Sequence, residues 1–520
     1  MSAGSGPNDS QLPSRADVVV VGAGHNGLVA ATLLARAGLQ VVVLERSEVV
    51  GGAARTEAPF ARVPQLRQST GAYLLGLMPP ELIALLDVQI PLLRRDPHYF
   101  LPTLQGRSYL FGSDGAANLA QLSARDRAAD EQLGAELSAL RSDLAPAWLA
   151  EPGSVEETAD RYVRPSLQAA FVDLCRGSVA DYLARFDFAD ELLVAMYAVT
   201  DGLSGLHAGP DTPGSGHNFL VHNMCRLPGA GGTWMVVQGG MGTVTQRIAE
   251  AARAAGAVIA VDAAVTGIEP GVGVHLADGR TVAARVVVGG CDPFRLAELL
   301  GPAVDPSIAA RLESVRLPGS TMKVNLALSR LPEFSCQPPG SPTPLGSTVH
   351  LLPGGERPMD AVRAMWSEVQ AGRLPDFPTI EWYVHTTVDP SLQDPAGHHS
   401  SALFVQSVPY ALAEGTWDEH RDAYTAHVIG IADRFAPGTA DAVADVFALA
   451  PPDIERHFGI TGGHIHHVDN GVAFADRVPY SWGNGVYAAS AGCHPAGSVI
   501  GAAGHNAAQR VLVDLGLPRA

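Results

Sequence analysis

Three glycines near the start of the chain have the spacing of a loop that binds a diphosphate. Gly22, Gly24 and Gly27 follow an apolar run at residues 17–21 and lead into a helical stretch at residues 28–37. In a strand–turn–helix unit, the first glycine permits the tight turn and the second lets a pyrophosphate approach the backbone. The third lets the helix pack against the strand. Because free N–H groups and the helix dipole favour negative charge at a helix N-terminus, the pattern predicts a dinucleotide site.

An acidic residue follows where a ribose contact is expected. A second apolar run at residues 41–44 ends at Glu45, which lies 23 residues after Gly22. A carboxylate at this position of a dinucleotide-binding unit binds a ribose hydroxyl. The alternative is an ordinary surface charge after a strand, and the complete unit favours the ribose contact. Arg46 is counted with Glu45 among the cofactor-binding residues.

A second glycine pair favours a flavin over a nicotinamide cofactor. Gly51 and Gly52 follow the ribose-binding position, with Arg55 three residues later. Such a pair lets the backbone pass close to the diphosphate and ribityl chain of FAD, and an NAD-binding domain does not need it. The sequence therefore predicts that one FAD is bound by this segment.

Residues 18–56 resemble the FAD-binding start of the phytoene desaturase and flavin amine oxidase superfamily. Residues 239–242 (Gly-Gly-Met-Gly) and 492–495 (Gly-Cys-His-Pro) resemble later segments of the same superfamily. The resemblance extends in particular to the bacterial relatives of pyridine nucleotide-disulphide oxidoreductase domain-containing protein 2, on residues 95–97 and 461–464 as well. Residues 257–265 are expected to form one strand, followed by a hairpin across residues 274–282 with its turn at Asp278 and Gly279. The resemblance implies that the strand around Val265 contacts the adenine. In the superfamily an arginine often follows the glycine pair directly, whereas here it stands at Arg55.

The same resemblance assigns roles near the C-terminus. It implies that Gly492 and Cys493 lie by the diphosphate or ribityl chain and that the Val499 amide approaches the pyrimidine ring. The helix N-terminus that follows suits the negative charge that accumulates on reduced flavin. A small buried residue is a second, compatible interpretation of Cys493.

The cysteines do not predict disulphide chemistry. All five are far apart in the chain, with no CxxC pair, and no second GxGxxG follows a strand: Cys175, Cys225, Cys291, Cys336 and Cys493. This pattern is typical of a reducing compartment and not of a disulphide reductase, whatever the name of the related branch suggests.

Two residues are candidates for catalysis. Lys323 is the only lysine in the sequence and lies on an alternating stretch at residues 322–329. In amine oxidases a lysine on the corresponding strand holds a water near flavin N5; a strand lysine whose amine reaches the surface is the equal alternative. By its motif, His494 lies beside the isoalloxazine, where it could relay a proton. A hydrogen-bonded structural histidine is the favoured alternative.

A histidine cluster at residues 464–467 does not predict a metal site. His464, His466 and His467 have no carboxylate or cysteine partners at ligand spacing. A histidine-rich active-site loop is the favoured interpretation, and no metal is predicted.

These segments must be positioned by an α/β fold. We expect a Rossmann-like FAD-binding domain of the discontinuous GR2 type plus an α+β substrate domain. Leucines at helical spacing from Leu133 to Leu144 indicate a helix in the first insertion, and Ser154 with Glu157 indicates a capping box that opens another. Alternation at residues 322–329, 380–388 and 402–408 indicates strands in the second insertion. The expected divisions are a disordered lead (1–16), FAD-binding parts (17–68, 229–293 and 477–520), a mostly helical substrate or lid region (69–228) and a substrate domain with a mixed sheet (294–476).

Composition narrows the partners. The 520 residues carry a formal charge of −18, and 47% of them are hydrophobic. An acidic surface repels phosphate backbones and anionic lipid headgroups, so nucleic acid is not an expected partner. The first 16 residues have no apolar core, and no run reaches the roughly 18 apolar residues of a membrane span. We expect a soluble, cytoplasmic protein with peripheral membrane contact left open; organellar relatives would be mitochondrial.

The expected activity is oxidation by hydride transfer to FAD from a C–H or C–N bond of a small or hydrophobic substrate, a small molecule that is mainly apolar. With a single dinucleotide site, an external acceptor such as oxygen or a quinone is expected to reoxidise the flavin. Two alternatives remain: redox-neutral isomerisation of a polyene, and a non-catalytic escort protein on the same scaffold. The sequence does not indicate an oligomeric state.

Overall fold

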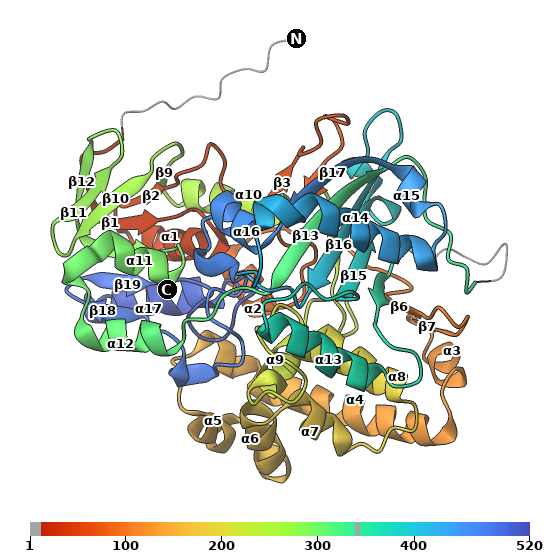
Figure 1. The fold of residues 1–520 in the computed structure, drawn as a ribbon. Coiled ribbons are helices and arrows are strands. Elements are labelled where there is room, and N and C mark those ends of the chain that lie inside the picture. The colour runs from red at the N-terminus through yellow and green to blue at the C-terminus, as the bar shows by residue number, and fades with distance from the viewer. Residues whose placement is uncertain (1–11, 338–343, 520) are drawn as a thin grey trace.

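The computed structural model describes residues 12–337 and 344–519. Two sheets lie side by side with helices around them, and a further layer of helices lies below the centre of the molecule and the second sheet (Figure 1). Most of the expected 1–16 lead lies outside the described residues, but the first strand, β1, begins at Arg15. The last two residues of that expected lead therefore belong to the nucleotide-binding sheet.

The nucleotide-binding sheet joins strands from distant parts of the chain. β1 pairs in parallel with both β2 and β12 because its valines are buried on both faces, as a central parallel strand requires. Near the C-terminus, β19 adds a further parallel strand beside β12. In spatial order the strands are β10 (Val265–Glu269), β11 (Gly273–Leu276), β12 (Thr281–Gly289), β1 (Arg15–Val21), β2 (Val41–Leu44) and β9 (Val258–Ala260), with β19 (Val486–Ala488) and β18 (Ser481–Gly483) attached at β12.

Residues 257–265, expected to form one strand, form parts of two. β9 pairs with β2, and the chain then leaves that strand through Asp262, which has a positive φ of 50°, before β10 begins at Val265. A single extended strand is wrong here because Ala263 N–H donates to Glu45 O and Asp262 N–H donates to Ser47 O, which bends the chain around the end of β2. The predicted hairpin after β10 is confirmed by the pairing of β11 with β12.

Helices from both ends and from the middle of the chain pack on this sheet. α1 contacts both α10 and α17, so the first, central and last FAD-binding parts meet at one helix. The helices of this half are α1 (His25–Arg36), α10 (Gly242–Ala254), α11 (Pro293–Leu300), α12 (Pro306–Ser314) and α17 (Ala502–Asp514). The fold is therefore the expected α/β fold with a discontinuous nucleotide-binding domain.

The second sheet is mixed. All of its neighbouring strands are antiparallel except β14 and β6, and α14 (Trp417–Phe435) buries its apolar face on it through residues such as Val428 and Phe435. Its order is β17 (Val443–Leu449), β13 (Thr321–Leu328), β16 (His399–Gln406), β15 (Thr379–Val384), β14 (Thr348–Leu351), β6 (Tyr99–Pro102) and β7 (Ser108–Phe111). The first insertion, expected to be mostly helical, thus contributes two strands to this sheet.

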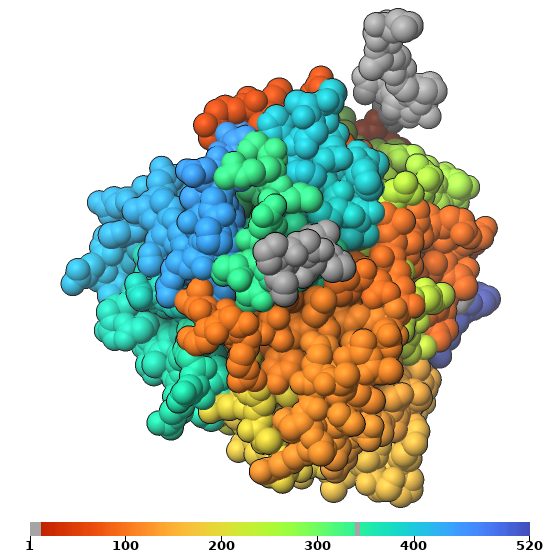
Figure 2. All heavy atoms as spheres, turned by 90° about the vertical axis from the view of Figure 1, so that its right-hand side faces the viewer, coloured from red at the N-terminus to blue at the C-terminus, as the bar shows by residue number. Residues whose placement is uncertain are grey.

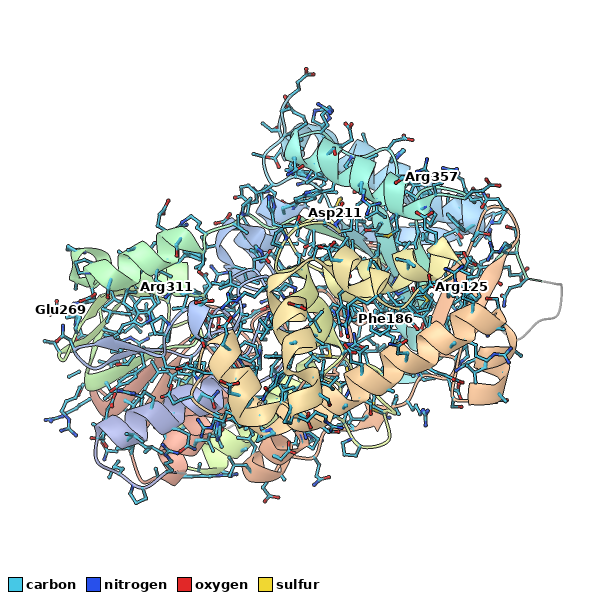
Figure 3. All side chains as sticks on the ribbon, turned by 90° about the horizontal axis from the view of Figure 1, so that it is seen from below. Arg125, Phe186, Asp211, Glu269, Arg311 and Arg357 are labelled. Atoms are coloured by element: carbon cyan, nitrogen blue, oxygen red, sulfur yellow. The ribbon has the colours of Figure 1, made fainter. Side chains whose placement is uncertain are left out.

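The helical layer confirms two local predictions. Leu133, Leu137, Leu140 and Leu144 are all buried on one face of α4, and the capping box at Ser154 and Glu157 is present at the start of α5. In Figure 3, Arg125 and Phe186 mark this layer, away from Glu269 on the nucleotide-binding sheet. Its helices are α3 (Gly115–Ala120), α4 (Ala124–Leu144), α5 (Val155–Tyr162), α6 (Gln168–Arg176), α7 (Val179–Ala184), α8 (Glu191–Tyr197) and α9 (Ser215–His222).

The remaining helices and strands lie around the two sheets and the helical layer. In Figure 2, which faces the second-sheet side, the orange segment that includes α3 and α4 occupies the lower part of the surface. None of the helices within residues 12–337 and 344–519 has the length and apolarity needed to cross a bilayer. The remaining elements are α2 (Pro80–Leu86), α13 (Pro358–Gln370), α15 (Thr439–Ala442), α16 (Pro451–Phe458) and the two-stranded pairs β3 (Thr56–Glu57) with β4 (Gln68–Ser69) and β5 (Leu92–Leu93) with β8 (Val236–Val237).

Candidate active site

A cavity of about 800 Å³ runs between the two sheets. At one end it is lined by the glycine-rich turn after β1 and by the ends of β2 and β12. At the other end it is lined by side chains of β13, β15 and β16 and of the helical layer. Its volume lies in the upper part of the range of small-molecule and cofactor pockets. The nucleotide-binding segment and the predicted substrate domain thus line one continuous cavity.

The glycine turn has the geometry that its spacing predicts. Gly22 has a φ of 99°, which a residue with a Cβ rarely adopts. A Cβ on Gly27 would lie 2.3 Å from the Gly22 carbonyl oxygen, so only glycine lets α1 pack this closely on the turn. Gly24 differs, because a Cβ there would have no protein atom nearer than Gly290 O at 4.0 Å. Gly24 lines the cavity, so its open side faces the bound molecule.

Glu45 is fixed at the carboxyl end of β2. One carboxylate oxygen accepts a hydrogen bond from Ala23 N–H at 2.8 Å, and the other accepts one from Ser47 N–H at 2.9 Å. The first bond ties the acid to the glycine turn, and the second holds it against the loop that follows β2. Glu45 lines the cavity together with Arg46 and Val265. The structure therefore brings these three predicted residues to one end of the cavity, as an adenosine site requires.

Arg55 offers a buried donor to the middle of the cavity. Its Nη2 lies 2.7 Å from His457 Nε2 and 3.1 Å from a Glu57 oxygen, and its guanidinium lies over the Phe458 ring at 5.2 Å. Its Nε has no hydrogen-bond partner among the described residues. Buried donors in native proteins are nearly always paired, so this N–H is available to an anionic group in the cavity.

These features fit FAD. Gly51 and Gly52 have positive φ and line the cavity beside Gly24, while Arg55 supplies an unpaired donor for a phosphate. Val499 lines the cavity just before α17, whose N-terminus follows Gly501. FAD supplies the electron-pair acceptor when it is bound in such a site.

The cavity lining does not include three residues predicted from the C-terminal motif, which are Gly492, Cys493 and His494. Gly492 packs against Pro293, and Cys493 is fully buried with its Sγ 3.6 Å from Ala488 O. Burial raises the pKa of the Cys493 thiol to about 11. The described geometry supports the compatible second interpretation of Cys493, as a small packed residue, and its cofactor contact stays a prediction.

His494 also lies behind the cavity wall. Its Nε2 is 3.0 Å from Ala147 O, and its ring packs against Phe474. Burial lowers the pKa of His494 to about 4, so the imidazole is neutral at physiological pH. The contacts support the structural interpretation that the sequence favoured, and the proton-relay role stays a prediction without a cavity contact.

The His494→Phe variant tests this placement. We expect the loss of the hydrogen bond to Ala147 O to destabilise the protein by about 1–3 kcal/mol. FAD content and the rate of flavin reduction should change by no more than about twofold, because the side chain does not reach the cavity. Thermal unfolding and anaerobic reduction measure the two effects. A drop in the reduction rate of about tenfold or more, at unchanged FAD content, would assign the histidine to the chemistry.

Lys323 projects from β13 into the second-sheet end of the cavity, which we call the inner chamber; it is lined by Tyr73, Arg95, Tyr99, Thr200, Asp201, His222, Trp234, Lys323, His350, Glu381, Tyr383 and Phe404. The Lys323 amine lies 3.5 Å from the centre of the Phe404 ring and 4.5 Å from that of Tyr73. Burial lowers the pKa of Lys323 to about 7, while the charge of Glu381 opposes the shift. At neutral pH this amine can therefore hold or release a proton.

Glu381 is an inner-chamber residue that sequence reasoning missed. It is buried on β15, and its carboxyl group accepts hydrogen bonds from Ser204 Oγ at 3.1 Å and from Tyr383 and Gln406. Burial raises the pKa of Glu381, and its hydrogen bonds and Lys323 oppose the shift. The strand alternation around residue 380 located the element but did not show which side chains face the chamber.

A π-helical turn supplies further chamber residues. The segment Ala198–Leu203 continues α8 and carries Thr200 and Asp201 into the chamber. Burial raises the pKa of Asp201 to about 7. Such turns are frequent at functional sites because they redirect side chains from a helix. No sequence signal marked this segment.

The histidine cluster at residues 464–467 contributes to the cavity wall. His464 Nε2 is 3.2 Å from Asp469 Oδ2, and His466 Nε2 is 3.1 Å from Ser204 O. Within the part of the chain that the structure describes, no three or more His, Cys, Asp or Glu side chains are grouped to hold a metal ion. His466 and His467 line the cavity, which agrees with an active-site loop.

A dinucleotide cradle that opens into a buried chamber on a second sheet defines an FAD-dependent oxidoreductase. The model of the flavin-containing amine oxidoreductases matches residues 27–332, and the chain belongs to this family. Mouse pyridine nucleotide-disulfide oxidoreductase domain-containing protein 2 is 33% identical over 98% of this chain and 95% of its own length.

Solved structures share the fold. An oxidoreductase from Methanosarcina mazei superposes with a TM-score of 0.63 at 17% identity, covering 95% of this chain and 99% of its own. A putrescine oxidase bound to putrescine gives a TM-score of 0.58 at 16% identity, covering 96% and 99%. At these identities the likeness concerns the architecture, which confirms the expected fold class.

Proposed function

We propose that this enzyme takes a hydride from a C–H or C–N bond of a small substrate held in the inner chamber, and that oxygen or a quinone is the final acceptor. The observation that carries the proposal is the single cavity that joins Gly24 and Glu45 to Lys323. A substrate in the chamber would lie next to the cofactor and away from bulk water, as hydride transfer requires.

The walls of the chamber favour a substrate with an apolar body and a polar group. Tyr73, Trp234 and Phe404 supply aromatic surface, while Arg95 and Glu381 are charged or titratable. Buried polar groups of this kind fix the orientation of a ligand in an otherwise apolar pocket. We therefore propose a substrate that carries a polar group in addition to the apolar body expected from the sequence.

Lys323 is the proposed catalytic residue. Its amine is buried among aromatic rings and has a pKa near the working pH, so it can hold a water molecule or accept a proton released by the substrate. The resemblance to amine oxidases supports the same position for a water-holding lysine. His494 is given no catalytic role in this proposal.

Anaerobic mixing tests the proposal. Candidate amines, acids and polyenes are added to the FAD-loaded protein under anaerobic conditions, and we expect at least one to bleach the oxidised flavin absorbance. The reduced enzyme is then mixed with oxygen or a quinone in a stopped-flow instrument. The product should be two hydrogens lighter than the substrate or, for an amine, should be the carbonyl compound formed by hydrolysis of the imine. Reoxidation by neither acceptor, or a product of unchanged mass, would contradict the proposal and favour isomerisation.

A further inference from the structure

Arg95 is a buried cation without a partner charge. It is 5% exposed and lines the inner chamber, where its Nε donates to Trp234 O at 3.0 Å and its Nη1 donates to Thr348 Oγ1 at 2.5 Å. No carboxylate among the described residues lies within 4 Å of it, although the structure contains many such pairs elsewhere. A buried charge is costly unless it is paired, so a guanidinium in this setting calls for an anion.

The guanidinium stays charged at neutral pH. Burial lowers the pKa of Arg95 to about 10, and the charges of Tyr383, Cys225 and Glu381 oppose the shift. This pKa lies well above neutrality. Arg95 is therefore a permanent cation under physiological conditions.

The charge of Arg95 disfavours protonation of three neighbouring histidines. Burial lowers the pKa of His98 and His385 to about 4 and that of His350 to about 3. The positive charge of Arg95 lowers each of these pKa values further. At neutral pH these imidazoles carry no charge and add no repulsion to an incoming anion. The potential at this end of the chamber is set by Arg95 itself.

Three carboxyl groups of the cavity are engaged by other residues: Glu381 and Asp201 of the inner chamber and Asp130 elsewhere in the cavity wall. Glu381 is bound by Tyr383, Asp201 accepts from Asn223 Nδ2 at 3.0 Å, and Asp130 is bound by Tyr197. Burial raises the pKa of all three, which disfavours their charged forms. Glu381 influences Arg95 through space but does not form an ion pair with it. None of these groups neutralises Arg95.

We propose that Arg95 binds a carboxylate of the substrate, so that the enzyme acts on an organic acid with an apolar body. This inference rests on the proposed function of the same chamber. Arginine presents a planar set of N–H donors that matches a carboxylate, and Nη2, which makes no protein hydrogen bond among the described residues, is free for that contact. A single permanent cation suits a monoanion, and the aromatic walls at Tyr73, Trp234 and Phe404 suit the apolar body.

Three probes of equal chain length test the inference. Octanoate, octanol and octylamine are titrated into the FAD-loaded protein, and the perturbation of the flavin absorbance gives each dissociation constant. We expect octanoate to bind at least about tenfold more tightly than octanol, with octylamine the weakest, because the Arg95 charge favours an anion. The measurement needs neither turnover nor a variant. Octanol binding as tightly as octanoate, or no octanoate binding at millimolar concentration, would overturn the inference.

Substitutions assign the effect to one side chain. In the Arg95→Met variant, octanoate should bind about 10- to 100-fold more weakly while octanol changes by less than about twofold. The Arg95→Lys variant keeps the charge but not the planar donors, and an intermediate loss is expected. Arg94→Met is the matched control, since Arg94 is exposed beside it and should bind octanoate as the wild type does. Unchanged octanoate affinity in Arg95→Met, at full FAD content, would refute the assignment.

The octanoate-binding experiment and the test of hydride transfer can fail independently of each other. If octanoate binding depends on Arg95 but no acid, amine or polyene bleaches the flavin, the carboxylate site stands and hydride transfer fails. If a neutral substrate reduces the flavin and octanoate has no preference over octanol, hydride transfer stands and the carboxylate site fails.

Discussion

The Gly24→Val variant should fold normally and purify without FAD. Gly24 has a φ of −70° and a ψ of 167°, which valine adopts readily, and no protein atom lies nearer than 4.0 Å to the position of its Cβ. The added methyl groups would therefore enter the cavity at the start of α1, where a diphosphate is expected to approach the backbone. We expect FAD affinity to fall by at least about 100-fold, because close approach of phosphate to the backbone is lost.

The measurements are the ratio of flavin to protein after purification, the dissociation constant for added FAD, and far-ultraviolet circular dichroism. Gly134→Val is the matched control, since Gly134 lies on the exposed side of α4 and has no atom within 4 Å of its Cβ position. That control should retain its flavin. A yellow Gly24→Val protein with one FAD per chain would show that the cofactor does not pass over this glycine.

The Lys323→Met variant should retain FAD but lose most of its activity. Methionine keeps much of the apolar volume between Tyr73 and Phe404 and removes the amine. If the amine accepts a proton or holds a water molecule, its loss should slow the limiting chemical step by about 10²- to 10⁴-fold. In the wild type the rate should rise with pH through about 7, because the neutral amine forms above that pKa.

The variant should lack this inflection in stopped-flow reduction or reoxidation measured from pH 6 to 9.

The pH dependence of the free energy of unfolding provides a second measurement, and its direction can be predicted. In the unfolded chain Lys323 has its ordinary pKa of 10.5, and in the native state about 7, so the unfolded state binds more protons between these values. Wild-type stability therefore gains from this group as pH rises through that window. We expect Lys323→Met to have the higher Tm at pH 7, with the difference shrinking toward pH 10. Equal activity and equal Tm would leave Lys323 with no role in the site.

The nucleotide-binding half was predictable because its signals are local. The strand, turn and helix around Gly22, Gly24 and Gly27 are consecutive in the sequence, and Glu45 follows at the end of the next strand. Local propensity and glycine requirements determine such a unit almost without reference to the rest of the chain. Residues 257–265 show the limit of this reasoning, because contacts with Glu45 and Ser47 break the expected strand in two.

The inner chamber was far less predictable. Lys323 stood out as the only lysine. Arg95, in contrast, precedes β6, whose Tyr99 pairs with Thr348 of β14, so its place in the chamber depends on a pairing between segments far apart in the chain. Glu381 lies on β15, and its side-chain direction depends on the register of that strand with β16. The motif around His494 could be found in the sequence, but the direction of its side chain could not. The His494 ring is turned toward Ala147. Sequence patterns give element type more readily than long-range register or the direction of a single side chain.

The position of β19 beside β12 has a consequence for biosynthesis. Residues 486–488 leave the ribosome last among the strands of the nucleotide-binding sheet, and α17, which packs on α1, follows them. Domains assembled from N-terminal segments can fold early in translation, but in this one residues 287–289 of β12 have no β19 partner until residues 486–488 have been made. The sheet that carries the glycine turn is therefore complete only after β19 has been synthesised, and before that β12 presents an unpaired edge to other extended chains.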